Sequence, residues 1–229
     1  MNGLLLAVSP EERRLAWQTF ACCPRHELAP SAVLSDIEPR ASRLLVVEEG
    51  VVALVAAAES PHPSIVALAG HGDVLAPPAE GERIRALTAA RVVVVPPGAY
   101  ERLLSLSGVA QALLESVLDA LGKRQQSLAS TRGNHAQRLQ ETLYGLARDH
   151  GKVRAEGVEI AVPLTHELLA QMVGSARETV TCTLARFQRE GMLVRNGRTY
   201  RMIVAPDLLE FPAGKRRAAP ATGAAHRHT

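Results

Sequence analysis

Charged and hydroxyl side chains follow one another at helical spacing near the C-terminal end of this 229-residue chain. The segment GSARETVTCTLARFQREGML begins at Gly174 and carries Arg177 and Glu178 one turn ahead of Thr181 and Cys182. An arginine can donate two hydrogen bonds to the major-groove edge of guanine, and a glutamate can accept one from the amino group of cytosine. These residue types therefore indicate contact with base pairs. The plainer interpretation is a solvated helix face on which Glu178 only closes a capping box.

The residues around this segment predict two helices joined by a tight turn. Thr165 is a suitable N-cap for a first helix with one apolar side, and Gly174 suits the turn that follows it. Ser175 and Glu178 have the spacing of a capping box at the start of a second helix. The apolar residues of that helix recur at one-turn spacing and predict its buried side: Val180, Leu184 and Phe187.

A β-hairpin is predicted after the second helix, which Gly191 ends as a C-cap. Its strands are Met192–Arg195 and Thr199–Val204, and its turn is Asn196–Gly197. Two short helices followed by a hairpin are typical of a winged helix-turn-helix, whose second helix fits the major groove of DNA. The residues expected to contact DNA are Thr165, Ser175, Arg177, Glu178, Thr181, Cys182, Arg186 and Arg198.

The segment LTHELLAQMVGSARETVTCTLARFQREGML resembles the DNA-binding domain of the cyclic-AMP receptor protein/fumarate-nitrate regulator (CRP/FNR) family of bacterial transcription factors. The most specific part is GSARETV, from Gly174 to Val180. The resemblance implies that Arg177 and Glu178 read bases. The family usually has arginine where this chain has Cys182, so the resemblance implies a half-site different from the usual one, with Thr181 and Arg186 as candidate substitutes.

Residues 31–96 consist of short apolar runs separated by Gly and Pro, which predicts an antiparallel sandwich or roll. Within it, Arg43–Glu48 and Val51–Ala58 are expected to form a hairpin around Glu49–Gly50. The order of runs resembles the β-roll sensor domain of the same family. The predicted fold class is α+β, with an N-terminal antiparallel β-roll like that of cyclic-nucleotide-binding domains, a long dimerisation helix and a C-terminal winged helix-turn-helix.

The same resemblance implies an effector pocket. Cyclic-nucleotide binders of the family place a Gly-Glu pair and then an Arg-Ser pair around the cyclic phosphate. Here the second position falls at Glu80–Gly81, so a carboxylate stands where a cation is expected and ordinary cyclic-AMP binding is not predicted. The alternatives are a structural turn at Gly72–Asp73 and solvated helix charges at Lys123–Arg124. The candidate effector contacts are Gly72, Asp73, Arg83, Arg85, Lys123 and Arg124, with Arg85 on a strand phase that can face away.

The period becomes helical from Tyr100 to Arg132. Leucines seven residues apart predict a coiled-coil seam, and a second copy of the chain is the simplest partner. Leu113 and Leu118 are expected to cover the β-roll; the alternative is that the whole helix packs on its own roll. Gly133 and Asn134 predict a hinge. The expected dimerisation residues are Leu114, Val117, Leu121 and Leu128.

Charge is distributed unevenly along the chain. Residues 1–131 hold 11 Lys/Arg and 14 Asp/Glu, whereas residues 132–229 hold 15 and 9. A basic C-terminal part favours a polyanionic partner. No apolar run reaches the ~20 residues of a membrane span, and the N-terminus lacks a basic leader, so a cytoplasmic protein without membrane contact is expected.

The three cysteines, Cys22, Cys23 and Cys182, fit neither a disulfide framework nor a zinc pattern. They also do not supply the thiolates of an iron–sulfur cluster. Ordinary thiols are favoured over a redox role. No metal or cofactor is predicted, although an unidentified small-molecule effector is compatible with the sequence.

Four segments are predicted: a β-roll sensor domain (1–99), a dimerisation helix and hinge (100–133), a winged helix-turn-helix (134–210) and a disordered basic tail (211–229). The favoured function is a homodimeric regulator that reads a palindromic DNA site and works with RNA polymerase. The alternatives are a DNA-binding protein of the same fold gated by no effector or by a protein partner, and a nonspecific architectural DNA binder. An enzyme with a Cys–His pair is disfavoured because no nucleophile motif and no catalytic residue is evident.

Overall fold

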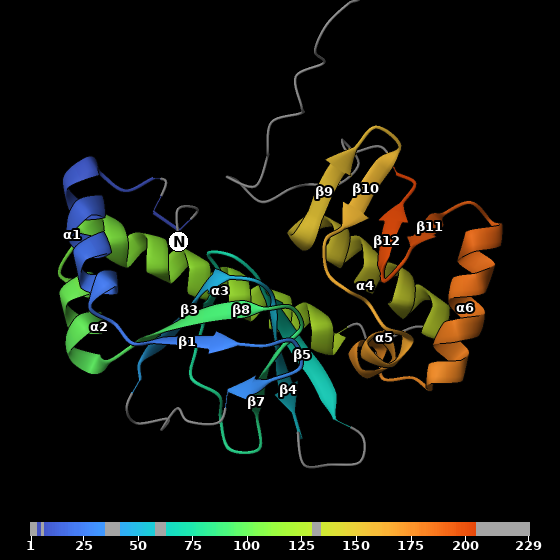
Figure 1. Cartoon of the computed structure of the whole chain (residues 1–229), viewed down its shortest axis with the longest axis horizontal. Helices are drawn as coiled ribbons and strands as arrows, with labels where there is room; N and C mark the ends of the chain where they lie inside the picture. The colour runs from blue at the N-terminus through green and yellow to red at the C-terminus, as the bar shows by residue number, and fades with distance from the viewer. Residues whose placement is uncertain (1–3, 6, 35–41, 58–62, 130–133, 205–229) are drawn as a thin grey trace, which may run out of the picture.

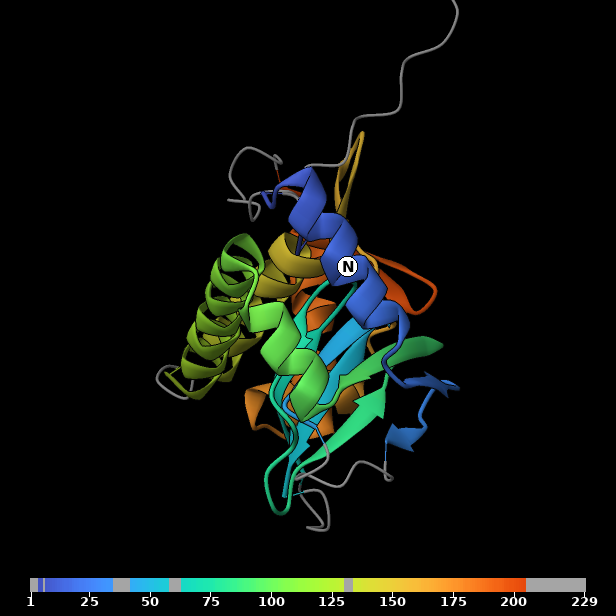
Figure 2. The same cartoon turned by 90° about the vertical axis from the view of Figure 1, so that its left-hand side faces the viewer.

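The computed structural model describes residues 4–5, 7–34, 42–57, 63–129 and 134–204 (Figure 1). Helices α1 (Pro10–Ala21) and α2 (Pro97–Leu104) lie at one end of a β structure, and residues 134–204 lie at the other end. The long helix α3 (Ser107–Ala129) runs along the β structure from one end toward the other, as Figures 1 and 2 show together. The predicted α+β fold class is confirmed.

Two antiparallel four-stranded sheets form the N-terminal β structure, called the β-roll below. The first sheet has the order β1 (Arg25–Leu28), β8 (Ala90–Val95), β3 (Leu44–Glu49), β6 (Val74–Leu75). The second has the order β2 (Val33–Leu34), β7 (Arg83–Ala86), β4 (Val52–Ala56), β5 (Ser64–Ala69).

The predicted hairpin of Arg43–Glu48 with Val51–Ala58 is wrong. β3 pairs with β8 and β6, whereas β4 pairs with β5 and β7, so the two consecutive strands belong to different sheets. The chain crosses between the sheets at Gly50, whose φ is +79°. A Cβ atom at Gly50 would lie 2.2 Å from the carbonyl oxygen of Ala89, so the close approach requires glycine.

β3 is apolar on both faces because both are covered. Leu44 and Val46 pack with α1, α2 and α3, whereas Leu45 and Val47 pack between the two sheets. Alternate side chains of a strand point to opposite faces, which explains why LLVV reads as a continuous apolar run.

Helices α1 and α4 begin at residues whose side chains cap them. Ser9 caps α1 by accepting a hydrogen bond from Glu12 N at 3.3 Å, and Pro10 occupies the first helical position. Asn134 and Gln137 form a capping box at the start of α4 (His135–His150). The predicted hinge residue Gly133 lies outside the described residues.

Residues 134–204, called the winged unit below, form three helices against a third sheet. Helix α4 packs with α5 (His166–Val173) and α6 (Arg177–Arg189). The sheet has the order β11 (Leu193–Asn196), β12 (Thr199–Met202), β10 (Gly157–Ile160), β9 (Gly151–Arg154). The core of this unit also includes Ala53, Val55 and Ile65 of the β-roll, so β4 and β5 present one face to the winged unit.

Candidate nucleic-acid interface

The helix-turn-helix has the predicted form. Thr165 caps α5 by accepting a hydrogen bond from Leu168 N at 3.0 Å. Its hydroxyl therefore serves the helix, although the residue was expected to contact DNA. α5 ends at Gly174, whose φ of +59° is the left-handed conformation that glycine adopts readily.

The predicted capping box at Ser175 and Glu178 is wrong. The N-cap of α6 is Ala176, and no side chain caps that helix. Ser175 still belongs to the turn, because its N–H donates to Ala170 O at 3.1 Å. Its Oγ is buried without a hydrogen-bond partner among the described residues, so a direct base contact by this hydroxyl is not favoured.

Helix α6 is divided into a buried and an exposed face, as predicted. Val180, Leu184 and Phe187 are at most 3 % exposed and join the core of the winged unit. The opposite face exposes Arg177, Glu178, Thr181, Cys182, Ala185, Arg186, Gln188 and Arg189.

Several of these exposed residues form no side-chain bond within the described residues that competes with a base, among them Arg177 and Glu178 at the start of the helix. The side chains of Arg177 and Glu178 form no hydrogen bond or ion pair with the part of the chain that the structure describes. By contrast, the guanidinium of Arg186 lies 5.5 Å from the ring centroid of Phe187 and 3.7 Å from a Glu190 carboxylate oxygen. Arg177 and Glu178 are also the first two residues of α6, and the N-terminal end of a recognition helix is the end that contacts base edges, so they are the better placed pair for base readout.

The wing follows α6 after Gly191, whose φ is +71°. Asn196 pairs with Thr199, so the two-residue turn is Gly197–Arg198 and lies one residue later than predicted. The carbonyl oxygen of Arg198 accepts a hydrogen bond from Leu164 N at 2.8 Å, which fixes the wing turn to the segment before α5. The Arg198 side chain is exposed at this turn.

His166, which sequence reasoning missed, connects these parts. Its Nδ1 lies 2.7 Å from Thr181 Oγ1 of α6, and its Nε2 lies 3.1 Å from the Tyr200 hydroxyl of β12. No pattern in the sequence points to this role, because the three residues are 15 and 34 positions apart.

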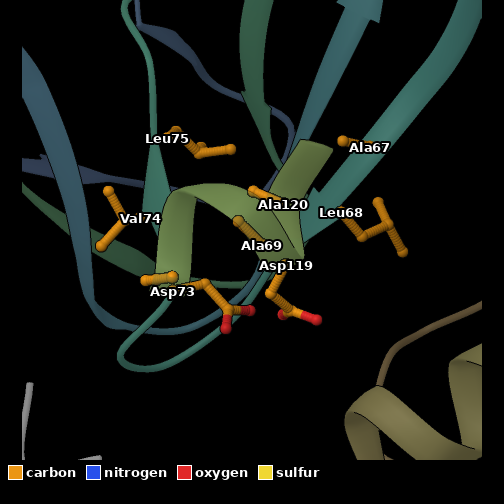
Figure 3. Close-up of a pocket in the computed structure, with 9 residues that line it drawn as sticks. Ala67, Leu68, Ala69, Asp73, Val74, Leu75, Asp119 and Ala120 are labelled. Carbon is orange, nitrogen blue, oxygen red and sulfur yellow. The ribbon is translucent and has the colours of Figure 1, made fainter. Parts of the chain in front are cut away.

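A small hollow between the β-roll and α3 is lined by one of the candidate effector residues, Asp73. Its volume is about 20 Å³, which is room for about one water molecule. Asp73 and Asp119 line it beside small apolar residues, and Figure 3 shows both carboxylates on the same side of the hollow.

The candidate effector residues are not gathered at this hollow. Gly72, with φ +86°, and Asp73, which accepts from Gly70 N at 2.7 Å, form the predicted structural turn. Arg85 instead donates to Gln171 Oε1 of α5 at 3.0 Å, and Arg83 is exposed on β7 and does not line the hollow. Lys123 and Arg124 lie in α3, and their side chains are outside the description.

The exposed face of α3 carries an apolar stripe. Leu114, Leu118 and Leu121 are 59 %, 57 % and 51 % exposed. Val117 packs against the core beside the β-roll, so the structure assigns Val117 and Leu118 the opposite way from the prediction. Each residue of a helix is rotated by about 100° from the one before it, so Val117 faces the core while its neighbour Leu118 faces outward. The side chain of Leu128 is outside the description.

Cys22 and Cys182 are exposed, whereas Cys23 is buried and donates to Thr19 O. Burial raises the pKa of the Cys23 thiol. Within the described residues no group of His, Cys, Asp and Glu is arranged to hold a metal ion.

Among the helices that the structure describes, no single one is long and apolar enough to cross a membrane. Helix α2 and residues 107–122 are together long and apolar enough for a membrane span, but the pair is bent by 112° at the break between them.

Known proteins are similar to this chain in sequence and in fold. Residues 137–210 match the Crp-like helix-turn-helix domain. Regulatory protein CysR of Synechococcus elongatus is 30 % identical over 151 residues, which cover 63 % of this chain and 68 % of CysR.

Two solved structures show the same fold at lower identity. A CRP-family transcriptional regulator from Thermus thermophilus superposes with a TM-score of 0.64 at 21 % identity, covering 80 % of this chain and 94 % of that one. A cyclic nucleotide-binding domain containing protein from Listeria monocytogenes gives a TM-score of 0.71 at 15 % identity, covering 86 % and 99 %.

Proposed function

This chain belongs to the CRP/FNR family of transcription regulators, and from that membership we propose that it acts as a homodimer on a palindromic DNA site. Its segments would be a β-roll sensor (1–99), a dimerisation helix with hinge (100–133), a winged helix-turn-helix (134–210) and a basic tail (211–229). RNA polymerase is the expected protein partner of such a regulator.

The observation that carries the proposal is the open polar end of α6. Arg177 and Glu178 are exposed and unpaired within the described residues, and the buried face of α6 fixes the direction in which they project. The wing turn beside α5 adds Arg198. Helix α6 would lie in the major groove with its N-terminal end toward the bases, and Arg198 would meet the adjacent phosphate backbone.

The apolar stripe of α3 supports the dimer. Each of Leu114, Leu118 and Leu121 would gain on the order of 1 kcal/mol or more by leaving water. Pairing α3 with the same helix of a second copy covers this stripe in both chains. The two copies of α6 would then enter successive major grooves about 34 Å apart.

Ordinary cyclic AMP is not the proposed effector, because the hollow beside α3 has room for only about one water molecule. The state of the sensor would instead reach DNA through the contact between the β-roll and the winged unit. That contact includes the Arg85–Gln171 hydrogen bond and the apolar face of β4 and β5. An effector or a protein partner that separates these surfaces would change the spacing of the two α6 helices.

In-vitro selection from random duplex DNA, followed by gel-shift titration and sedimentation, tests the proposal. The expected result is an inverted repeat bound by two chains at least ~10³-fold more tightly than random DNA. Equal affinity for selected and random DNA would favour the architectural binder. Whether RNA polymerase is a partner is tested by transcription reconstituted with the polymerase on a promoter that carries the selected repeat.

A further inference from the structure

His166 joins three elements of the winged unit through a chain of hydrogen bonds. The Thr181 hydroxyl donates to Arg177 O at 2.9 Å and lies 2.7 Å from His166 Nδ1. On the other side of the ring, Nε2 lies 3.1 Å from the Tyr200 hydroxyl. Helices α5 and α6 and strand β12 of the wing therefore meet at one imidazole.

The donors and acceptors along these hydrogen bonds indicate which nitrogen of His166 carries the proton. The Tyr200 side chain is buried, and among the described residues Nε2 of His166 is the acceptor for its O–H, so Nε2 carries no proton. The proton of the neutral ring is then on Nδ1, which donates to Thr181 Oγ1, and the Thr181 O–H donates to Arg177 O. The neutral Nδ1–H tautomer is the form in which all three contacts are satisfied hydrogen bonds.

The surroundings also favour the neutral ring. Tyr200 is 1 % exposed, and its hydroxyl would lose its acceptor if Nε2 were protonated. Burial lowers the pKa of His166, and the positive charges of Arg195 and Arg177 lower it further. Burial raises the pKa of Tyr200, which keeps its proton available as the donor.

We propose that His166 is a positioning residue for base readout, which holds Thr181 on the groove-facing side of α6 and connects α6 to the wing. The proposal rests on the proposed function. Thr181 has no proton left for a base, so it can offer only a lone pair and its methyl group. It would therefore suit an amino group of adenine or cytosine, or the thymine methyl, and could not donate to guanine.

Two conservative variants each keep one of the two hydrogen bonds that the His166 ring forms with Thr181 and Tyr200. Asn carries an amide N–H near the position of Nδ1, so His166→Asn keeps the Thr181 arm. Gln reaches the position of Nε2, so His166→Gln keeps only the Tyr200 arm. Thr181→Val removes the hydroxyl itself. The control is His26→Gln, because His26 lies on β1 of the β-roll and not in the winged unit.

The binding experiment uses the full chain, the site selected with wild type and several salt concentrations. His166→Gln and Thr181→Val should each weaken binding about five- to tenfold, and their combination should be no weaker than either alone. His26→Gln should bind like wild type, and His166→Asn, which keeps the bond to Thr181 but loses the bond to Tyr200, should bind more tightly than His166→Gln. The slope of log affinity against log salt should not change, whereas loss of a phosphate contact would reduce it by about one.

Three results would overturn the positioning role: unchanged affinity of His166→Gln, additive losses in the double variant, or a reduced salt slope. Long-range ¹H–¹⁵N spectra of the free protein provide a test without DNA. The His166 signals, identified by their loss in His166→Asn, should show a protonated Nδ1 and a bare Nε2. The opposite tautomer would refute the proposed role of His166, whether or not the protein selects a DNA sequence. Failure of the wild-type protein to select a DNA sequence would instead count only against the proposed regulator function.

Discussion

Arg177 and Glu178 are the two residues on which base readout should depend most directly, because they lie at the N-terminal end of α6 and neither side chain forms a hydrogen bond or ion pair within the described residues. A bidentate arginine–guanine pair contributes about 1–3 kcal/mol of discrimination. Arg177→Ala should therefore weaken binding to the selected site by about that amount and relax the preference at one base pair. Arg14→Ala on α1, at the other end of the molecule, is the matched control. Gel-shift titration against all four bases at each position measures both effects, and an unchanged profile would contradict the contact.

His166 gives the winged unit a defined pH dependence. Its pKa is lowered in the folded protein, so between that value and the ordinary value of about 6.5 the unfolded chain binds a proton that the folded chain does not. Acid therefore favours unfolding: stability falls as pH drops below neutrality and levels off below the folded-state pKa. Tm measured from pH ~8 to ~5 should fall less in His166→Asn than in wild type. Parallel curves for the two proteins would show that His166 does not contribute.

At the scale of elements, Gly50 decides how β3 is followed by β4. Gly50→Ala must accept a φ of +79° and place its Cβ 2.2 Å from a backbone oxygen. Gly81→Ala is the matched control, because its φ is +77° and none of the described atoms lies within 4 Å of the added carbon.

The control should lose about 1–2 kcal/mol from the backbone conformation alone. Gly50→Ala should lose about 2 kcal/mol more because its clash is with backbone. Urea denaturation measures both free energies of unfolding. Equal losses would show that the crossing tolerates a side chain.

At the scale of the whole molecule, the stripe of α3 predicts the oligomeric state. Leu121→Asp places a carboxylate among residues that the dimer would bury, so the dimer should dissociate and binding to the full palindrome should fall. Leu104→Asp is the control, because Leu104 is similarly exposed but lies on α2. Sedimentation equilibrium of both variants measures the effect. A dimer that survives Leu121→Asp would place the interface elsewhere.

The sequence by itself determined the parts that depend on local chemistry. The cap at Thr165, the left-handed turn at Gly174 and the buried stripe of α6 each follow from residues within a few positions of one another. The resemblance to a known family added the order of these parts, which the shared fold confirmed.

Tertiary structure decided what depends on contacts between distant residues. The pattern LLVVEEGVVALV fits a hairpin, yet its two strands join different sheets because helices cover one side of β3 and the winged unit covers one side of β4. Arg85 bonds α5 because the winged unit lies against β7, and His166 gains its role from residues of α6 and β12. A linear pattern records how apolar or polar a residue is, but its partner is set only when elements far apart in the chain pack together.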